Sequence, residues 1–235
     1  MRTKLLVLLL LVANTLYAAD IIPQPRSVVE GNGEYLLDAK ATLVCDKELG
    51  DAADYLLSYL PLRKVSSKRA DVRLVLDDKL KSEEYQLRID TNGVEVRGGA
   101  YGGVFNGLQT LLQLMPSEVY AKSLKLPVKV GHIVVSDAPR YAYRGFLLDV
   151  ARTYMPLHEV KRAIDYMALL KLNKLHFHLV DNTGWRIEIK SHPELAKVGG
   201  WRGGDSPIHP VYGSFFEKYG GYYTQDELRE VVKYA

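Results

Sequence analysis

Residues 143–186 constrain the fold of this chain more than any other segment. Two apolar stretches, at 145–150 and 175–180, are separated by an amphipathic helical pattern, which predicts a strand–helix–strand unit. Each stretch is followed by a loop with a charged residue, Arg152 after the first and Asp181 after the second. In a parallel α/β barrel the active site is built from the loops at the carboxyl ends of the strands. The segment therefore predicts the first part of an enzyme active site.

This segment belongs to a second module, residues 139–235. Its first strand is apolar except for Asp149, and such strands are buried on both faces in parallel sheets. Pro156 suits the first turn of the following helix. A further helix is predicted after Thr224, because Glu227 completes a capping box.

The first module, residues 20–138, mixes strands and helices without a βαβ rhythm, which predicts a small α+β domain. Strands are expected at 36–43, 72–76, 85–90, 94–97 and 128–135, and helices at 48–60 and 104–115. The third and fourth of these strands flank Asn92-Gly93, which is a strong hairpin signal. The glycines within 98–103 lack the lysine of a phosphate-binding loop, and we expect a turn that leads into the second helix.

Residues 1–19 have the pattern of a secretory signal peptide. Arg2 and Lys4 precede an unbroken apolar run, and small residues follow it at a cleavage site. The run is too short to span a hydrocarbon core of about 30 Å, so export with cleavage is expected rather than membrane anchoring. The lack of an Asn-x-Ser/Thr sequence favours a bacterial periplasmic or extracellular location.

The charge balance indicates no polyanionic partner. The formal net charge of +3 includes the two cationic residues of the signal peptide, so the mature chain is nearly neutral. Such a chain gives no electrostatic case for binding nucleic acid or an anionic membrane surface. The single cysteine, Cys45, lies in an apolar stretch, and we expect it to be a small buried hydrophobe rather than a nucleophile.

Arg152 and Asp149 lie close to the end of the first strand of the second module. An arginine at this point can direct a planar, permanently charged set of donors at substrate hydroxyls or carboxylates. Its alternative role is a structural ion pair with Asp149 or Asp181, and the spacing alone does not separate the two roles. Asp149 itself is expected to be mainly structural, because it points into the sheet.

His176 and His178 share one face of the second strand, because side chains alternate along a strand. With Asp181 three residues after His178, they could hold a divalent metal in a hydrolase. The alternative is a pair of histidines packed inside a barrel, with Asp181 acting as an acid/base residue or orienting one. Trp185 and Trp201 could offer an aromatic platform for a sugar ring, or could pack at the rim.

The motifs LDVAR-T-Y, KLNKLHFHLVDNTGWRIEI and HPEL resemble the start of the catalytic barrel in the family-20 glycoside hydrolases, the β-N-acetylhexosaminidases. The interval of 29 residues from Arg152 to Asp181 is similar as well. The segments YGGVFNGLQTLLQLM and APRYAYRG resemble the small α+β domain that precedes the barrel in that family. The resemblance covers residues 21–235. It implies an α+β accessory domain followed by the beginning of a (β/α)₈ TIM barrel.

The resemblance also implies an activity, the hydrolysis of terminal non-reducing N-acetyl-β-D-hexosamine residues of glycans, with no cofactor and no metal. It implies that Arg152 binds hydroxyls of the sugar and that Asp181 belongs to a polar relay that supports the general acid. Asp149 and His178 are secondary candidates at the same site. The reaction is expected to retain configuration through attack of the substrate's own 2-acetamido group on C1, without an enzyme nucleophile.

Two positions depart from the family pattern. Asn182 stands where the family often has a second aspartate, and Thr153 where it often has a histidine. A closed barrel takes about 250 residues, whereas residues 143–235 supply 93, so a truncated barrel is expected. The family's catalytic Asp-Glu pair would then lie beyond Ala235, and this chain alone is expected to be inactive. Two alternatives stay open, a metal-dependent amidohydrolase-like barrel and a non-catalytic glycan-binding relative.

Overall fold

The computed structural model describes residues 20–67, 69–182, 184–206 and 217–235. The signal peptide predicted for residues 1–19 lies outside the described residues. The chain divides into two compact units, the first ending at Arg140 and the second beginning at Tyr141. None of the described helices is long and apolar enough to cross a membrane.

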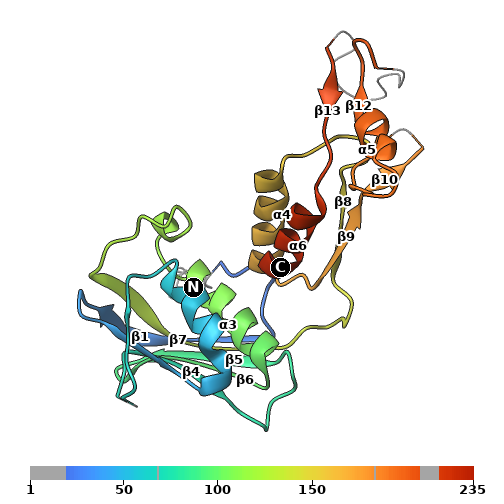
Figure 1. Ribbon diagram of the computed structural model, residues 1–235. Coiled ribbons are helices and arrows are strands. Elements are labelled where there is room, and N and C mark those ends of the chain that lie inside the picture. Colours follow the sequence, from blue (N-terminus) through green and yellow to red (C-terminus); the bar gives the residue numbers. More distant parts are fainter. Residues whose placement is uncertain (1–19, 68, 183, 207–216) are drawn as a thin grey trace, which may run out of the picture. The chain divides into compact units, whose positions relative to one another are not determined.

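The first unit is built on a seven-stranded sheet with the strand order β1-β7-β5-β6-β4-β2-β3 (Figure 1). Its strands are β1 (Ser27–Leu37), β2 (Thr42–Cys45), β3 (Arg63–Lys64), β4 (Val72–Leu76), β5 (Tyr85–Asp90), β6 (Gly93–Gly98) and β7 (Val128–Asp137). The predicted hairpin is confirmed, because β5 and β6 are antiparallel and Asp90 pairs with Gly93 at the turn.

Two helices, α2 (Gly50–Leu57) and α3 (Tyr101–Gln113), lie on one face of this sheet (Figure 1). A 3-10 helix, η1 (Lys47–Leu49), precedes α2, and a second, η2 (Ser117–Val119), follows α3. The buried leucines of α3 pack with strand residues such as Leu87 in one continuous hydrophobic core. Burial of these apolar side chains holds the helices on the sheet.

Three predictions for the first unit are wrong: the bounds of one strand, the lack of a βαβ arrangement, and a turn at Gly102 and Gly103. The strand expected at 36–43 is interrupted after Leu37, because Asp38 forms a turn in which its Oδ1 accepts a hydrogen bond from the Lys40 backbone N–H at 2.6 Å. The carbonyl oxygen of Asp38 also accepts one from the Ala41 N–H at 3.1 Å. A βαβ arrangement is present as well, since β2 and β4 flank α2 in the chain and pair in parallel.

Helix α3 begins at Tyr101, so Gly102 and Gly103 lie within it rather than in a turn before it. A Cβ atom at Gly103 would lie 2.3 Å from the carbonyl oxygen of Glu84. The segment before β5 therefore approaches the helix more closely than any larger residue allows. This contact accounts for a glycine in a helix, where its propensity is poor.

The second unit contains the predicted strand–helix–strand motif (Figure 1). Strands β8 (Gly145–Asp149) and β9 (Lys174–His178) are parallel neighbours, and α4 (Leu157–Leu169) connects them. The other elements are β10 (Val180–Asp181), β11 (Gly184–Trp185), α5 (Glu194–Gly199), β12 (Trp201–Arg202), β13 (Tyr219–Gly220) and α6 (Gln225–Tyr234).

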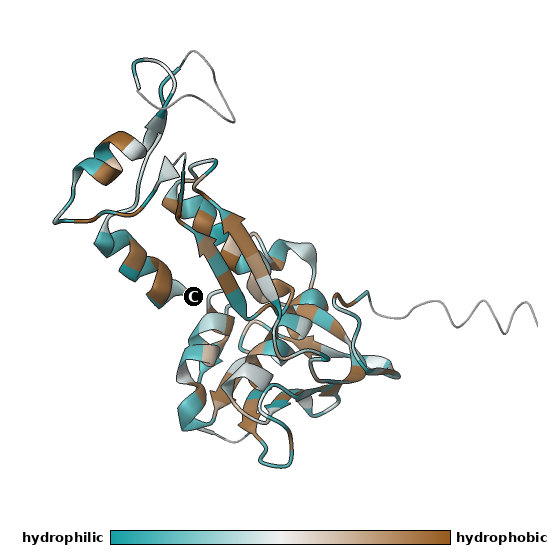
Figure 2. Ribbon diagram, turned by 90° about the vertical axis from the view of Figure 1, so that its right-hand side faces the viewer, coloured by the Kyte–Doolittle hydropathy of each residue, from teal (hydrophilic) through white to brown (hydrophobic). Residues whose placement is uncertain are grey.

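Strand β8 is less buried than its sequence predicts. Phe146 and Leu147 are 42% and 51% exposed, and Leu148 is the buried residue of the strand. Three consecutive hydrophobic residues occupy the middle of β8, whereas hydrophobic and polar residues alternate along β9 (Figure 2). Among the described residues β8 pairs with β9 alone, so it lacks the second neighbour that a central strand of a parallel sheet has.

Helix α6 begins with the predicted capping box. The Oγ1 of Thr224 accepts a hydrogen bond from the Glu227 backbone N–H at 3.2 Å, and the Thr224 N–H donates to the Glu227 carboxylate at 2.7 Å. Val231 of this helix packs with Leu148 and Tyr223 in the core of the second unit. Packing and capping together position α6 in this unit.

Candidate active site

The carboxyl ends of β8 and β9 bring together the four residues that the family resemblance selects as site candidates. Asp149 ends β8 and pairs in register with His178, which ends β9. Arg152 follows β8 by three residues, and Asp181 follows β9 by three residues. Parallel pairing places both strand ends at the same edge, so these four side chains form one ionic cluster.

Arg152 bridges the two carboxylates of this cluster. Its Nη1 lies 2.6 Å from the Asp149 Oδ2, and its Nη2 lies 3.0 Å from the Asp181 Oδ2. The Arg152 backbone N–H also donates to the Asp149 Oδ1 at 3.0 Å. The ion pairs anticipated as an alternative role are therefore both formed. The arginine side chain is nevertheless 49% exposed, so a ligand can approach it.

The carboxylate of Asp181 is hydrogen-bonded to one residue before it and to one residue after it in the chain. Its Oδ2 lies 3.2 Å from the His178 Nε2, and its Oδ1 accepts the Asn182 backbone N–H at 2.7 Å. Together with the contact from Arg152, these bonds fix the orientation of the carboxylate. A carboxylate held in this way can in turn orient a neighbouring donor group.

Both carboxyl groups are stabilised in their ionised form. Hydrogen bonds from the Asn182 backbone and then from His178 lower the pKa of Asp181. Burial opposes ionisation of Asp149, but the hydrogen bonds and positive charge of Arg152 outweigh it and lower the pKa of that carboxyl. Each group therefore stabilises the fold above its ordinary pKa of 3.8, and this contribution is lost as the pH falls through the lowered value.

The histidines of β9 differ in their surroundings. His178 is half-buried and faces Asp181, whereas His176 is exposed, and the two ring centroids lie 6.0 Å apart. A metal site would need His176, His178 and Asp181 to converge on one point. In the part of the chain that the structure describes, no three His, Cys, Asp or Glu side chains are arranged to hold a metal ion.

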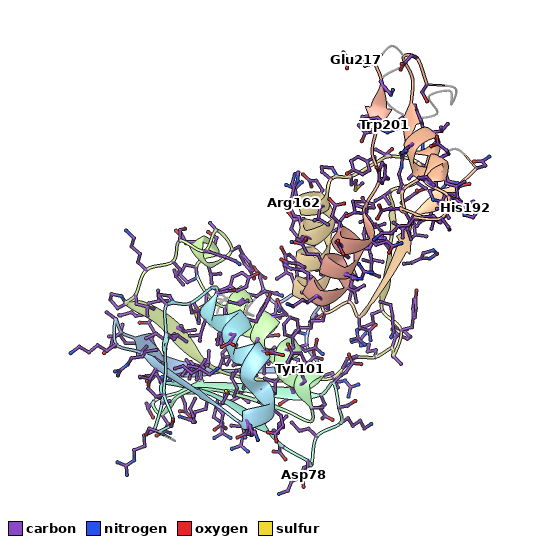
Figure 3. All side chains as sticks on the ribbon, in the orientation of Figure 1. Asp78, Tyr101, Arg162, His192, Trp201 and Glu217 are labelled. Carbon is purple, nitrogen blue, oxygen red and sulfur yellow. The ribbon has the colours of Figure 1, made fainter. Side chains whose placement is uncertain are left out.

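The two tryptophans are both half-buried and tied to their own segments. The Trp185 Nε1–H donates to the Ile187 carbonyl oxygen at 2.8 Å. Trp201, labelled in Figure 3, lies on β12, and the Lys218 Nζ lies 5.8 Å from the centroid of its ring. Their proposed use as a sugar platform stays a prediction.

Two arginines next to the Arg152 loop were not predicted from the sequence. Arg186 and Arg202 are 0% and 2% exposed, and both donate hydrogen bonds to the Ala151 carbonyl oxygen next to Arg152. The signal that could have found them is a repeated Trp-Arg dipeptide next to glycine, at 184–186 and 200–202.

A paired strand–helix–strand unit with ionic side chains gathered at its carboxyl end defines a class, the α/β enzymes whose active sites lie at the ends of parallel strands. Comparison with family models gives the particular family. Residues 18–138 match "Glycosyl hydrolase family 20, domain 2", and residues 141–235 match "Glycosyl hydrolase family 20, catalytic domain". The chain belongs to glycosyl hydrolase family 20. The predicted fold class, an α+β domain followed by the start of the catalytic domain, is confirmed.

Individual relatives agree with this assignment. The chain is 37% identical over 224 residues to a beta-hexosaminidase of Vibrio furnissii, an alignment that covers 92% of the chain and 35% of the relative. It superimposes with a TM-score of 0.84 on the exo beta-N-acetylglucosaminidase of Vibrio harveyi, solved in complex with N-acetylglucosamine, at 32% identity, covering 93% of this chain and 34% of that one. For the N-acetyl-beta-hexosaminidase of Streptomyces plicatus, the TM-score is 0.78 at 35% identity, covering 92% and 43%. The chain thus spans between about a third and about two fifths of the length of these relatives.

Proposed function

We propose that this protein hydrolyses terminal non-reducing N-acetyl-β-D-hexosamine residues of glycans. Membership of glycosyl hydrolase family 20 supports a glycosidase, and the relative from Vibrio harveyi was solved with N-acetylglucosamine. The observation that carries the proposal is the ionic cluster, in which Arg152 bridges Asp149 and Asp181 at adjacent strand ends. A guanidinium fixed by two carboxylates is a rigid donor for sugar hydroxyls.

The mechanism that we propose is retaining and substrate-assisted. The 2-acetamido oxygen of the sugar attacks C1, so that the nucleophile is held inside the substrate at a high effective molarity. Arg152 binds hydroxyls of the terminal sugar, and Asp181 orients a polar relay to the general acid. The paired hydrogen bonds that fix Asp181, from His178 and from the Asn182 backbone, support this orienting role.

The substitution Arg152→Ala tests the proposal in the full-length protein. Hydrogen bonds from a charged group contribute about 1.5–3 kcal/mol each, so we expect kcat/KM to fall roughly 10- to 100-fold, mainly through KM. The measurement is the release of nitrophenol from an aryl N-acetyl-β-glucosaminide. Arg229→Ala is the matched control, because Arg229 is an exposed arginine paired with Asp226 on α6.

Two results would count against this function. Unchanged kinetics in Arg152→Ala would reduce Arg152 to a structural ion-pair partner. Binding of N-acetylglucosamine without any release of nitrophenol by the wild-type protein would instead identify a non-catalytic glycan-binding protein.

We also propose that the protein is exported. The support is the basic start, the apolar run and the small residues of a cleavage site within residues 1–19. Amino-terminal sequencing of the protein purified from its cells should begin close to Asp20. A chain that retains Met1 and stays in the cytoplasmic fraction would contradict export.

A further inference from the structure

Two buried arginines hold the backbone of the loop that carries Arg152. Arg186 follows β11, and its Nε donates to the Val150 carbonyl oxygen at 2.9 Å and its Nη2 to that of Ala151 at 3.0 Å. Arg202 ends β12, and its Nη2 donates to the same Ala151 oxygen and its Nη1 to the Arg152 oxygen at 2.6 Å. Three successive carbonyl groups after β8 therefore accept hydrogen bonds from guanidinium groups.

The backbone N–H groups of the same loop also form hydrogen bonds. The Ala151 N–H donates to the His178 carbonyl oxygen at 3.1 Å, and the Arg152 N–H donates to the Asp149 carboxylate at 3.0 Å. Gly184 lies against the loop, since a Cβ atom there would be 2.2 Å from the Ala151 oxygen. Few other conformations of this loop would satisfy the same set of contacts.

Arg186 also joins this loop to two distant segments. Its Nη1 donates to the carbonyl oxygens of Gly200, before β12, and of Gly221, before α6, the latter at 3.1 Å. The carbonyl groups that meet on this one side chain thus lie up to 36 residues away from Arg186 in the chain. The position of the Arg152 loop depends on all of them.

Within the described ranges these two arginines form hydrogen bonds to carbonyl groups and not ion pairs. Among the described residues, neither one contacts a carboxylate, and the Arg202 Nε is buried without a hydrogen-bond partner. Burial and then the charge of Arg202 lower the pKa of Arg186 to about 10, and burial also lowers that of Arg202. Desolvating two guanidinium groups is unfavourable. A guanidinium group, however, is a planar fork of donors that can bind successive carbonyl groups. A lysine ammonium group lacks this geometry.

We propose that Arg186 and Arg202 are positioning residues for substrate recognition. By holding the carbonyls of residues 150–152, they keep the Arg152 guanidinium where it bridges Asp149 and Asp181. This role rests on the proposed function, because it assumes that Arg152 contacts the sugar. Neither buried arginine touches the substrate itself.

In the full-length protein, Arg202→Lys tests this role, because lysine keeps the charge but lacks the planar fork of donors. The matched control is Arg144→Lys. Arg144 precedes β8 at the opposite end of the strand and also donates to carbonyls, from Nε to Lys171 and from Nη1 to Tyr141, both at 2.8 Å. Both variants are expected to lose some thermal stability. Only Arg202→Lys should lower kcat/KM, by about tenfold and mainly through KM, since displacing a binding group by 1 Å can cost up to about 100-fold.

The decisive comparison uses the Arg152→Ala background. If Arg202 acts through Arg152, then Arg202→Lys should have no further effect on kcat/KM once Arg152 is removed. A full additional loss in that background, or equal kinetics in the Arg202→Lys and Arg144→Lys proteins, would overturn the positioning role. Should Arg202→Lys not fold, Arg186→Lys provides the same test.

A second measurement does not depend on activity. Amide hydrogen exchange at Ala151 and Arg152 should accelerate in Arg202→Lys and stay unchanged in Arg144→Lys. Exchange that changes as expected in a protein without hexosaminidase activity would overturn the proposed function and leave the loop contacts intact. Unchanged exchange in an active protein would overturn the positioning role alone.

Discussion

At the scale of single residues, Asp181 offers the sharpest mechanistic test. Its pKa is lowered by hydrogen bonds from Asn182 and His178, so it carries a negative charge throughout the neutral range. In the full-length protein, Asp181→Asn keeps the size of the side chain and removes this charge. We expect kcat to fall roughly 10- to 100-fold, less than the loss of about 10²–10⁴-fold that removal of a general acid can cause.

The pH–rate profile separates this role from a purely structural one. Loss of the Asp181 charge should shift the acid limb of the profile, because the relay to the general acid loses a neighbouring anion. Asp149→Asn is the matched comparison, since Asp149 also pairs with Arg152, whereas the hydrogen bond of His178 in the described part of the chain is to Asp181. A profile of Asp181→Asn that superimposes on that of the wild type would remove Asp181 from the mechanism.

The sequence predicts the residues of the ionic cluster, but it does not predict the two buried arginines that hold the Arg152 loop. Arg152 and Asp181 stand out because a charged residue directly after an apolar strand has few structural explanations. Arg186 and Arg202 carry the same charge, but their hydrogen-bond acceptors lie between 14 and 51 residues away in the chain. No local pattern distinguishes an arginine that is buried on carbonyl groups from one that is solvated, so this support becomes visible only in the fold.

At the scale of elements, Asp71 connects three strands of the first unit. It precedes β4, and its carboxylate accepts hydrogen bonds from the Tyr35 hydroxyl of β1 at 2.7 Å and from the Thr42 N–H and Oγ1 of β2 at 2.8 and 2.7 Å. Burial opposes its ionisation, but these hydrogen bonds outweigh burial and lower its pKa. The stabilisation is present above the ordinary pKa of 3.8 and is lost as the pH falls through the lowered value.

Asp71→Asn should therefore destabilise the first unit at neutral pH and much less in acid. A charged hydrogen bond contributes about 1.5–3 kcal/mol, so we expect a loss of about 2 kcal/mol at pH 7. Urea unfolding of both proteins at pH 7 and near pH 3 gives the comparison. Asp38→Asn is the control, because asparagine replaces aspartate well in a turn of this kind. A difference between wild type and Asp71→Asn that does not shrink in acid would contradict the role of the charge.

The capping box of α6 gives a second expectation at this scale. Thr224→Ala removes the acceptor for the Glu227 N–H and should lower the free energy of unfolding of the second unit by about 1 kcal/mol. Thr224→Ser keeps the hydroxyl and should retain most of the stability. Thermal unfolding followed by circular dichroism makes the comparison, and equal melting temperatures for the two variants would show that the cap contributes nothing.

The elements with strong local signals were predicted correctly, but one parallel strand pairing of the first unit was missed. The hairpin of β5 and β6 and the capping box of α6 depend on a few adjacent residues, and both are confirmed. The parallel pairing of β2 with β4 joins strands that η1, α2 and the short strand β3 separate in the chain. The helix between these strands was predicted, but no local pattern shows which strand pairs with which, so the βαβ arrangement was missed.

At the scale of the whole molecule, the two units differ in the size of their hydrophobic cores. Every strand of the seven-stranded sheet belongs to the first unit, and its helices share one continuous core with that sheet. The second unit has a smaller core cluster, and its paired strands leave Phe146 and Leu147 exposed. Stability follows the apolar area that is removed from water, so the first unit should be the more stable of the two.

Residues 20–140 are therefore expected to fold when they are expressed alone. The fragment should give a dispersed amide NMR spectrum and unfold in a single cooperative transition, because its sheet and its core need no residue from beyond Arg140. Residues 141–235 expressed alone should unfold at a lower temperature and bind a hydrophobic dye, since about half of the surface of Leu147 is exposed. A collapsed spectrum for residues 20–140, or a higher melting temperature for residues 141–235, would show that the continuous core does not determine which unit is the stable one.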